Sequence, residues 1–373
     1  MIIKRPAVKV TQGKLIFFAT SFKVSHLIQQ NFYRVDKLDV DNSQSGFQRV
    51  LDENRAKRLA KYLSEGVTDG DAFLPTSVLL ATDKTIPYDE ATHEISIDLS
   101  TIGSFNVVDG QHRIEGLIIA AKENPRVLDF EISANIAIEL DDVNQMCHFL
   151  IVNTTQKSVD KSVEQQIVAR LTSMIDIKDI PTLPKWIRRQ VVRGEDREAL
   201  LIANYLNTEK DSPWFGKIKM ANETKDGTSI EQKSFVQSTK MYLLTSSNPL
   251  NQITDFNKRN HILKNYWIAI ASLLTIPDTE TVIFKTIGLE IFNLISPTIF
   301  QKLLLLGSFT VGTFKNELSK ALENLPTEYQ HLRSAEWWIR GHGASDLNKS
   351  AARKIANELN KAITAKESGE IEV

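Results

Sequence analysis

The sequence predicts an α/β domain followed by a mostly α-helical domain. Up to about residue 160, short β-rich runs mix with amphipathic helical patterns, whereas almost everything after that point has helical periodicity. The chain has 373 residues, of which 42% are hydrophobic and 24% charged. It is therefore long enough to bury a substantial core and to divide into two domains. We place these domains at residues 1–165 and 166–373.

The first domain contains four segments with the apolar pattern of β-strands, and we expect them to form one mostly buried sheet. They are residues 75–82, 93–99, 104–108 and 131–140. A helix is expected at 52–64, because Asp52 can cap it and small or apolar residues recur on one face. Further helices are expected at 142–152 and 160–174, separated by the polar segment 153–158.

The second domain is expected to be a helical bundle. The helical patterns cover residues 195–206, 234–244, 257–274, 283–295, 298–306, 313–322 and 347–365. Glycine and polar clusters at 207–230 and 341–346 indicate loops between them.

Composition excludes several classes of protein. A formal net charge of −1 argues against a broad basic surface, so any contact with nucleic acid must come from local patches. The single cysteine, Cys147, rules out an internal disulfide and a cysteine-only zinc site. No leader peptide and no run of about 18 apolar residues is recognised, so we expect a cytoplasmic protein without a membrane segment.

The most informative segment is 106–117, N-V-V-D-G-Q-H-R-I-E-G-L, in which an apolar strand leads directly into a helix. The first amides of a helix lack intrahelical acceptors and lie at the positive end of its dipole, so a phosphate could bind above Gly110, Gln111, His112 and Arg113. His112 would add a donor, and Arg113 could bind two phosphate oxygens. The alternative is a tight turn in which Asp109 caps the helix and His112 packs at its start.

Two more polar clusters accompany this turn. Arg49, in G-F-Q-R-V-L-D-E-N-R, could pair with a phosphate or simply lie on a solvated helix entry. Asn153 and Thr154, in N-T-T-Q-K, could bind a ligand or form a helix C-cap followed by a turn. No P-loop, zinc motif or nucleophile elbow is present.

Together, D-G-Q-H-R, the upstream F-Q-R-x-L-D-E-x-R and the downstream N-T-T-Q-K-S-V resemble the DGQHR-domain proteins of the ParB/sulfiredoxin-like superfamily. The resemblance covers about residues 30–165 and implies an α/β (α+β) domain with a mixed sheet. Proteins of this family are encoded with bacterial DNA-modification systems, so the resemblance implies the same setting here. The segment N-T-T-Q-K-S-V-D-K-S-V favours the DpdB type, of 7-deazaguanine modification, over the DndB type, of phosphorothioate modification. Sulfinic-acid repair is excluded, because Gln111 stands where sulfiredoxins carry their cysteine.

The resemblance implies that the turn holds ATP or a related triphosphate, with Mg²⁺, and hydrolyses it slowly. Asp109 would hold the metal or orient water, His112 would donate to a phosphate oxygen, and Arg49 with Arg113 would balance the developing charge. The implied partners are DNA and a transglycosylase-like enzyme; homodimer formation is left open. The rival hypothesis is a non-enzymatic DNA-binding regulator, as in DndB-type proteins. A ParB-like nuclease lacks support, because no acidic metal cluster is evident.

A basic segment in the second domain could contact DNA. Its basic residues, which recur at helical spacing, are Lys185, Arg188, Arg189 and Arg193. A solvated helix face would show the same pattern.

Overall fold

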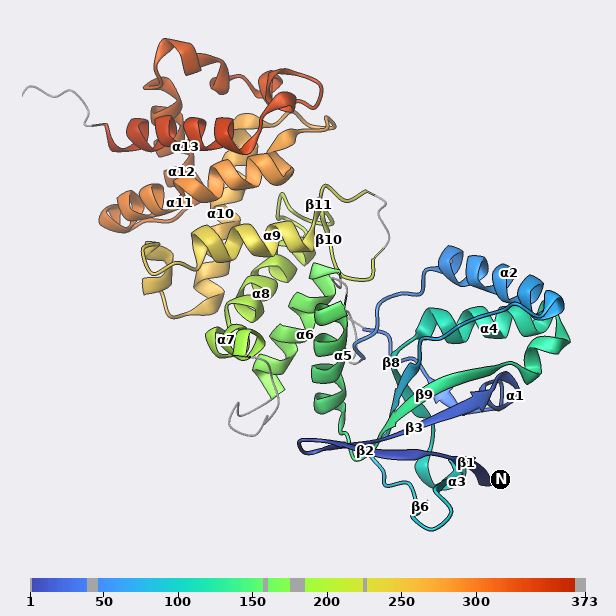
Figure 1. Ribbon diagram of the computed structural model, residues 1–373. Coiled ribbons are helices and arrows are strands. Elements are labelled where there is room, and N and C mark those ends of the chain that lie inside the picture. The colour runs from blue at the N-terminus through green and yellow to red at the C-terminus, as the bar shows by residue number, and fades with distance from the viewer. Residues whose placement is uncertain (1, 39–45, 157–159, 175–184, 224–226, 366–373) are drawn as a thin grey trace, which may run out of the picture. The chain divides into compact units, whose positions relative to one another are not determined.

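Contacts divide the protein into two compact units (Figure 1). The computed structural model describes residues 2–38, 46–156, 160–174, 185–223 and 227–365. The first unit comprises residues 1–167 with 175–185, and the second comprises residues 168–174 with 186–373.

The first unit is built on a mixed six-stranded sheet. The strand order is β2 (Val8–Gln12), β3 (Leu15–Lys23), β9 (Glu131–Ala137), β5 (Val78–Ala81), β8 (Phe105–Asp109) and β4 (Tyr33–Arg34). Only the pairs β5/β9 and β4/β8 are parallel. The expected mixed sheet is therefore confirmed, although β2, β3 and β4 had not been singled out in the sequence.

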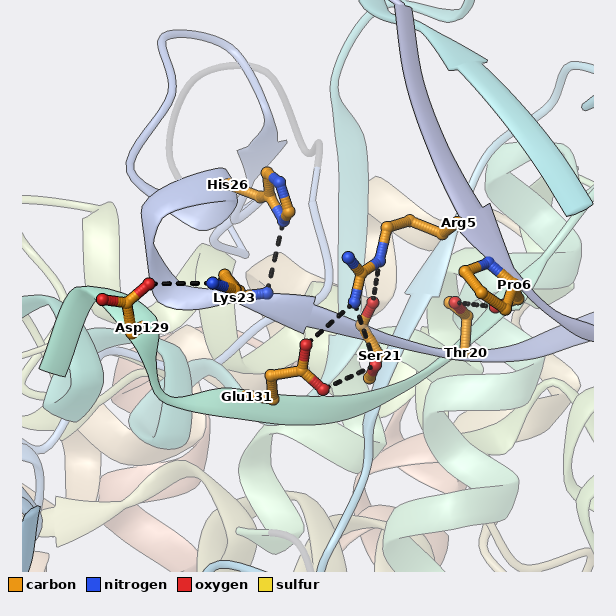
Figure 2. Close-up of polar contacts among 8 residues, drawn as sticks. All are labelled: Arg5, Pro6, Thr20, Ser21, Lys23, His26, Asp129 and Glu131. Carbon is orange, nitrogen blue, oxygen red and sulfur yellow. Dashed lines mark hydrogen bonds and ion pairs between the residues drawn. The ribbon is translucent and has the colours of Figure 1, made fainter.

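A second sheet, of three strands, contains β1 (Ile2–Pro6), β7 (Glu94–Asp98) and β6 (Tyr88–Asp89). The expectation that 93–99 joins the main sheet is wrong, because β7 pairs with β1 and β6 instead. Figure 2 shows how β1 is fastened to the main sheet. Arg5 of β1 donates to the Ser21 carbonyl of β3 (2.8 Å) and to the Glu131 carboxylate of β9 (3.2 Å).

The helices of the first unit are α1 (Val24–Leu27), α2 (Glu53–Asp69), α3 (Leu99–Ile102), α4 (Gln111–Glu123) and α5 (Asp142–Gln156), with α6 (Lys161–Met174) continuing into the second unit. As expected, Asp52 caps α2 by accepting the Arg55 amide at 3.0 Å. The predicted end of α5 at 152 is wrong. Asn153 lies within this helix, where its amide donates to the Phe149 carbonyl one turn earlier.

Helices α2 and α4 pack side by side and run parallel (Figure 1). At one end the Asp52 amide donates to His112, and at the other Asn124 donates to the Ser64 carbonyl. Gly116 permits the close approach between them, since a Cβ there would lie 3.0 Å from Leu59. The N-termini of both helices consequently lie together, and with them the positive ends of both dipoles.

The second unit is helical, as expected. Its helices are α7 (Lys185–Arg193), α8 (Glu195–Thr208), α9 (Gln232–Ser238), α10 (Phe256–Leu274), α11 (Thr286–Leu306), α12 (Val311–Glu323) and α13 (Lys349–Thr364); β10 (Ile218–Lys219) and β11 (Ile230–Glu231) form a short parallel pair. Fully buried aromatic side chains, among them Trp214, Tyr266 and Trp267, fill the core.

The two predicted helices 283–295 and 298–306 are in fact parts of one helix, α11, with Pro297 inside it. Proline cannot donate to the carbonyl four residues back, which is that of Asn293. The Ser296 hydroxyl donates to this carbonyl instead, at 2.8 Å, so it stays satisfied. α11 is long and apolar enough to cross a membrane, but 56% of its apolar window is buried inside the fold, as in a core helix.

Candidate anion-binding pocket

The predicted strand-turn-helix at 106–117 is present. β8 ends at Asp109, Gly110 is the N-cap residue, and α4 begins at Gln111. Gly110 has φ +102°, and a Cβ on it would lie 2.7 Å from Val78 Cγ1, so both conformation and space require glycine. No side chain caps α4, and the alternative in which Asp109 does so is wrong.

This uncapped helix end borders a pocket of about 510 Å³. The pocket is lined by Gln48, Arg49, Arg55, Leu59, Leu74, Thr76, Asp109, Gly110, Gln111, His112, Arg113, Phe149, Val152 and Asn153, all of the first unit. Two of the three polar clusters found in the sequence thus meet at one cavity, and the third contributes Asn153. Thr154 was also expected there, but its side chain lies outside the described part of the structure.

His112 is buried and joins the two helix N-termini. Its Nε2 accepts the backbone N–H of Asp52 at 3.0 Å, so the neutral ring carries its proton on Nδ1. Burial lowers the pKa of His112, and the charges of Arg49 and Arg55 lower it further. His112 is therefore a neutral donor near pH 7 and is poorly suited to act as a general acid.

Arg113 is already engaged. Its Nη1 donates to the Ser77 carbonyl at 2.8 Å, and its Nη2 pairs with the Asp109 carboxylate. The expected pair of bonds from Arg113 to a phosphate would have to replace these contacts. Asp109 is likewise occupied, and within the described residues no group of three or more His, Cys, Asp or Glu gathers to hold a metal ion. The protein groups at this turn therefore do not fit a dedicated Mg²⁺ site.

Arg49 and Arg55 bring positive charge to the pocket wall. Neither residue takes part in an ion pair among those found in the described ranges. Arg55 was not among the residues expected at the site. Its place in F-Q-R-x-L-D-E-x-R, three residues after the cap Asp52, was the available signal, because that spacing puts it in the first turn of α2.

Two glutamines shape the pocket wall. Gln48, which is buried and which the sequence did not single out, donates from Nε2 to the carbonyls of Val107 (2.7 Å) and Val108 (2.8 Å). Gln111 donates weakly to the Arg49 carbonyl (3.3 Å), while its buried Oε1 has no partner in the described part of the chain. An orphaned acceptor costs about 1–3 kcal/mol, a cost that a donor from a ligand or water would remove.

The basic residues expected to contact DNA lie on α7, which belongs to the second unit from Trp186 onward. Arg188, Arg189 and Arg193 are exposed, while Ile187 and Val191 are buried. The structure does not describe the side chain of Lys185. The three arginines and the pocket belong to different units, so each is considered by itself.

Residues 5–167 match the family described as DndB, DNA-sulfur modification-associated. The match covers nearly all of the first unit and less than half of the chain. It associates the protein with DNA modification, and it names the type that the sequence had made the alternative, rather than the preferred 7-deazaguanine type. Comparisons with curated proteins and with solved structures found no match.

Proposed function

We propose that this protein is an accessory protein of a DNA-modification system that binds a phosphate-bearing ligand in the first unit and uses it to regulate DNA binding. One observation carries the proposal: the uncapped N-terminus of α4 opens on the same pocket as Arg49 and Arg55, which form no ion pair within the described residues. The family match to a DNA-sulfur modification-associated type supports the setting. Such a role places the protein in the cytoplasm.

The electrostatics of the pocket favour an anion. α2 and α4 bring two positive dipole ends together, and Asp52 satisfies only the first turn of α2. The positive end of the α4 dipole and the guanidinium groups of Arg49 and Arg55 repel one another, and an anion bound among them removes this repulsion. A phosphate supplies that charge and accepts from several donors at once.

The lining also suggests what accompanies the phosphate. Leu59, Leu74, Phe149 and Val152 form an apolar part of the wall, and about 510 Å³ is within the usual range for small-ligand sites. A nucleotide such as ATP has both a charged and a flat apolar part. We therefore propose a nucleotide as the ligand, as the sequence motifs also suggest.

The occupied side chains favour binding over hydrolysis. Asp109 is paired with Arg113, and the Nε2 atom of His112 accepts a hydrogen bond from the Asp52 backbone N–H, so it holds no proton to donate as a general acid. Within the described residues the pocket also lacks a carboxylate cluster for a metal-activated water. Of the two functions that the sequence allows, a ligand-sensing regulator thus has more support than a nucleotidase; a transglycosylase-like partner stays a prediction.

Calorimetric titration of the full chain with ATP, with and without Mg²⁺, tests the proposal alongside a phosphate-release assay. We expect saturable binding with no turnover above background, and Arg49→Ala should weaken binding about tenfold or more. If the folded protein binds neither ATP nor inorganic triphosphate, the pocket assignment is wrong. Steady turnover that disappears in His112→Gln and Asp109→Asn variants would establish the nucleotidase instead.

For DNA we propose the exposed face of α7, where Arg189 and Arg193 lie one turn apart and Trp186 is 40% exposed. If both arginines bind phosphates, replacing both by alanine should make the slope of log affinity against log salt concentration less steep. The change should be about 0.9 for each phosphate that is no longer neutralised. Lys354→Ala, at an exposed position of α13, is the charge control. An unchanged slope in the double variant would contradict this assignment.

A further inference from the structure

The pocket holds three arginines, and their surroundings differ. Arg113 folds back across Gly110, close enough that a Cβ on Gly110 would lie 3.3 Å from Arg113 Nη2. Its two terminal nitrogens bind Asp109 at the end of β8 and the Ser77 carbonyl just before β5. We call Asp109, Gly110 and Arg113, with the Ser77 carbonyl, the clasp.

The clasp neutralises the charge of Arg113 within the protein. An incoming anion would meet the Asp109 carboxylate as well as the guanidinium, and their effects on it largely cancel. To bind the anion with both terminal nitrogens, Arg113 would have to release a backbone carbonyl and a carboxylate, which are costly to leave unpaired. The clasp instead holds the ends of two neighbouring strands to the start of α4.

Arg55 has the opposite surroundings. It lies in the first turn of α2 and lines the pocket, and no ion pair of the described residues involves it. It lines the same pocket as Gly110 and His112, so it lies near the α4 N-terminus. Its positive charge also contributes to the lowered pKa of His112. Its charge is therefore available to a ligand.

We infer that Arg55, together with Arg49, binds the anionic group of the ligand, whereas Arg113 of the D-G-Q-H-R motif is a positioning residue that holds the turn. This inference rests on the proposed anion pocket and assigns its ligand contacts. In this arrangement the negative charge of Asp109 opposes ligand binding, because it stands in the same wall without contributing a donor.

The test compares variants of the full chain in calorimetric titrations with ATP and with inorganic triphosphate. Arg55→Ala should weaken binding about tenfold or more, as expected when a charge-assisted hydrogen bond is removed. The matched control is Arg58→Ala, which removes the same charge from an exposed position of α2 that does not line the pocket. We expect it to change affinity by less than about threefold, the scale of a screened surface charge.

Asp109→Asn tests the positioning role of Arg113 without replacing Arg113 itself. Under our inference it raises affinity severalfold and lowers stability, because a repelling charge goes and the clasp weakens. If Asp109→Asn weakens binding while Arg55→Ala resembles Arg58→Ala, the inference is overturned although the pocket stands. If the wild-type protein itself binds neither probe, the proposed function fails first.

Discussion

Replacing Gly110 by alanine tests the geometry on which the whole pocket depends. At φ +102° an L-residue is strained, at a cost of about 1 kcal/mol. The new methyl group would also lie 2.7 Å from Val78 Cγ1 and 3.1 Å from Val78 Cβ, too close for a real contact. Overpacking of this kind costs about 1–3 kcal/mol, so we expect Gly110→Ala to destabilise the first unit by about 2–4 kcal/mol.

A second glycine separates the two contributions. Gly70, which ends α2, has φ +80°, and nothing lies within 4 Å of a Cβ built there. Gly70→Ala should therefore cost only the conformational part, about 1 kcal/mol. The difference between the two variants measures the clash with Val78. Adding Val78→Ala to Gly110→Ala should recover part of the loss, as a favourable coupling.

Hydrogen exchange read by mass spectrometry is the suitable assay. All five tryptophans lie at or after position 186, so intrinsic fluorescence reports on the second unit. Peptides covering β8 and α4 should lose protection in Gly110→Ala, and peptides of α10 and α11 should not. Equal protection in the Gly110→Ala and Gly70→Ala variants would refute the close approach of Val78 and with it the described turn.

Three other outcomes are expected. Gln48→Leu should lower the stability of the first unit by about 2 kcal/mol or more, because two buried carbonyls lose their donor; unchanged exchange in β8 would contradict this. Burial, the largest cause for each, lowers the pKa of His26, His112 and His148 from 6.5. The folded chain therefore binds these protons more weakly than the unfolded chain does. The three histidines' contribution to the unfolding free energy is fully present above about pH 6.5 and is lost as the pH falls through their lowered pKa values. A urea midpoint that stays flat or rises as the pH is lowered from about 7.5 to 5.5 would disprove this. Burial raises the pKa of the Cys147 thiol to about 12, so a thiol reagent at about pH 8 should react only after unfolding, and rapid labelling of the native protein would be inconsistent with the buried position.

Local patterns predicted much of the architecture. The cap at Asp52, the strand before Gly110 and the helix after it depend on neighbours within a few residues, so their spacing in the sequence is sufficient evidence. The same holds for α8, α10 and α12, whose predicted limits fall within a few residues of those observed.

Three predictions about strand pairing and helix limits were wrong. β7 was expected in the main sheet but lies in the second sheet, because it pairs with β1, about ninety positions earlier in the chain. Residues 283–295 and 298–306 were expected to be two helices, but they form one helix, α11, in which the Ser296 hydroxyl satisfies the carbonyl that Pro297 leaves without a donor. Asn153 was expected at the end of α5 and lies within it.

Neighbouring residues were enough to establish that an arginine-bearing, glycine-dependent turn opens a helix in an α/β domain, because the chemistry of that turn lies in a few adjacent positions. Which arginine is neutralised and which is available became clear only from the folded chain. A bond to the Ser77 carbonyl, 36 positions earlier in the chain, holds Arg113 in place while its charge is neutralised by Asp109. Arg55 reaches the same pocket from another helix and meets no carboxylate in the described residues. Charge compensation depends on distance in space, and that distance exists only once strands and helices have packed.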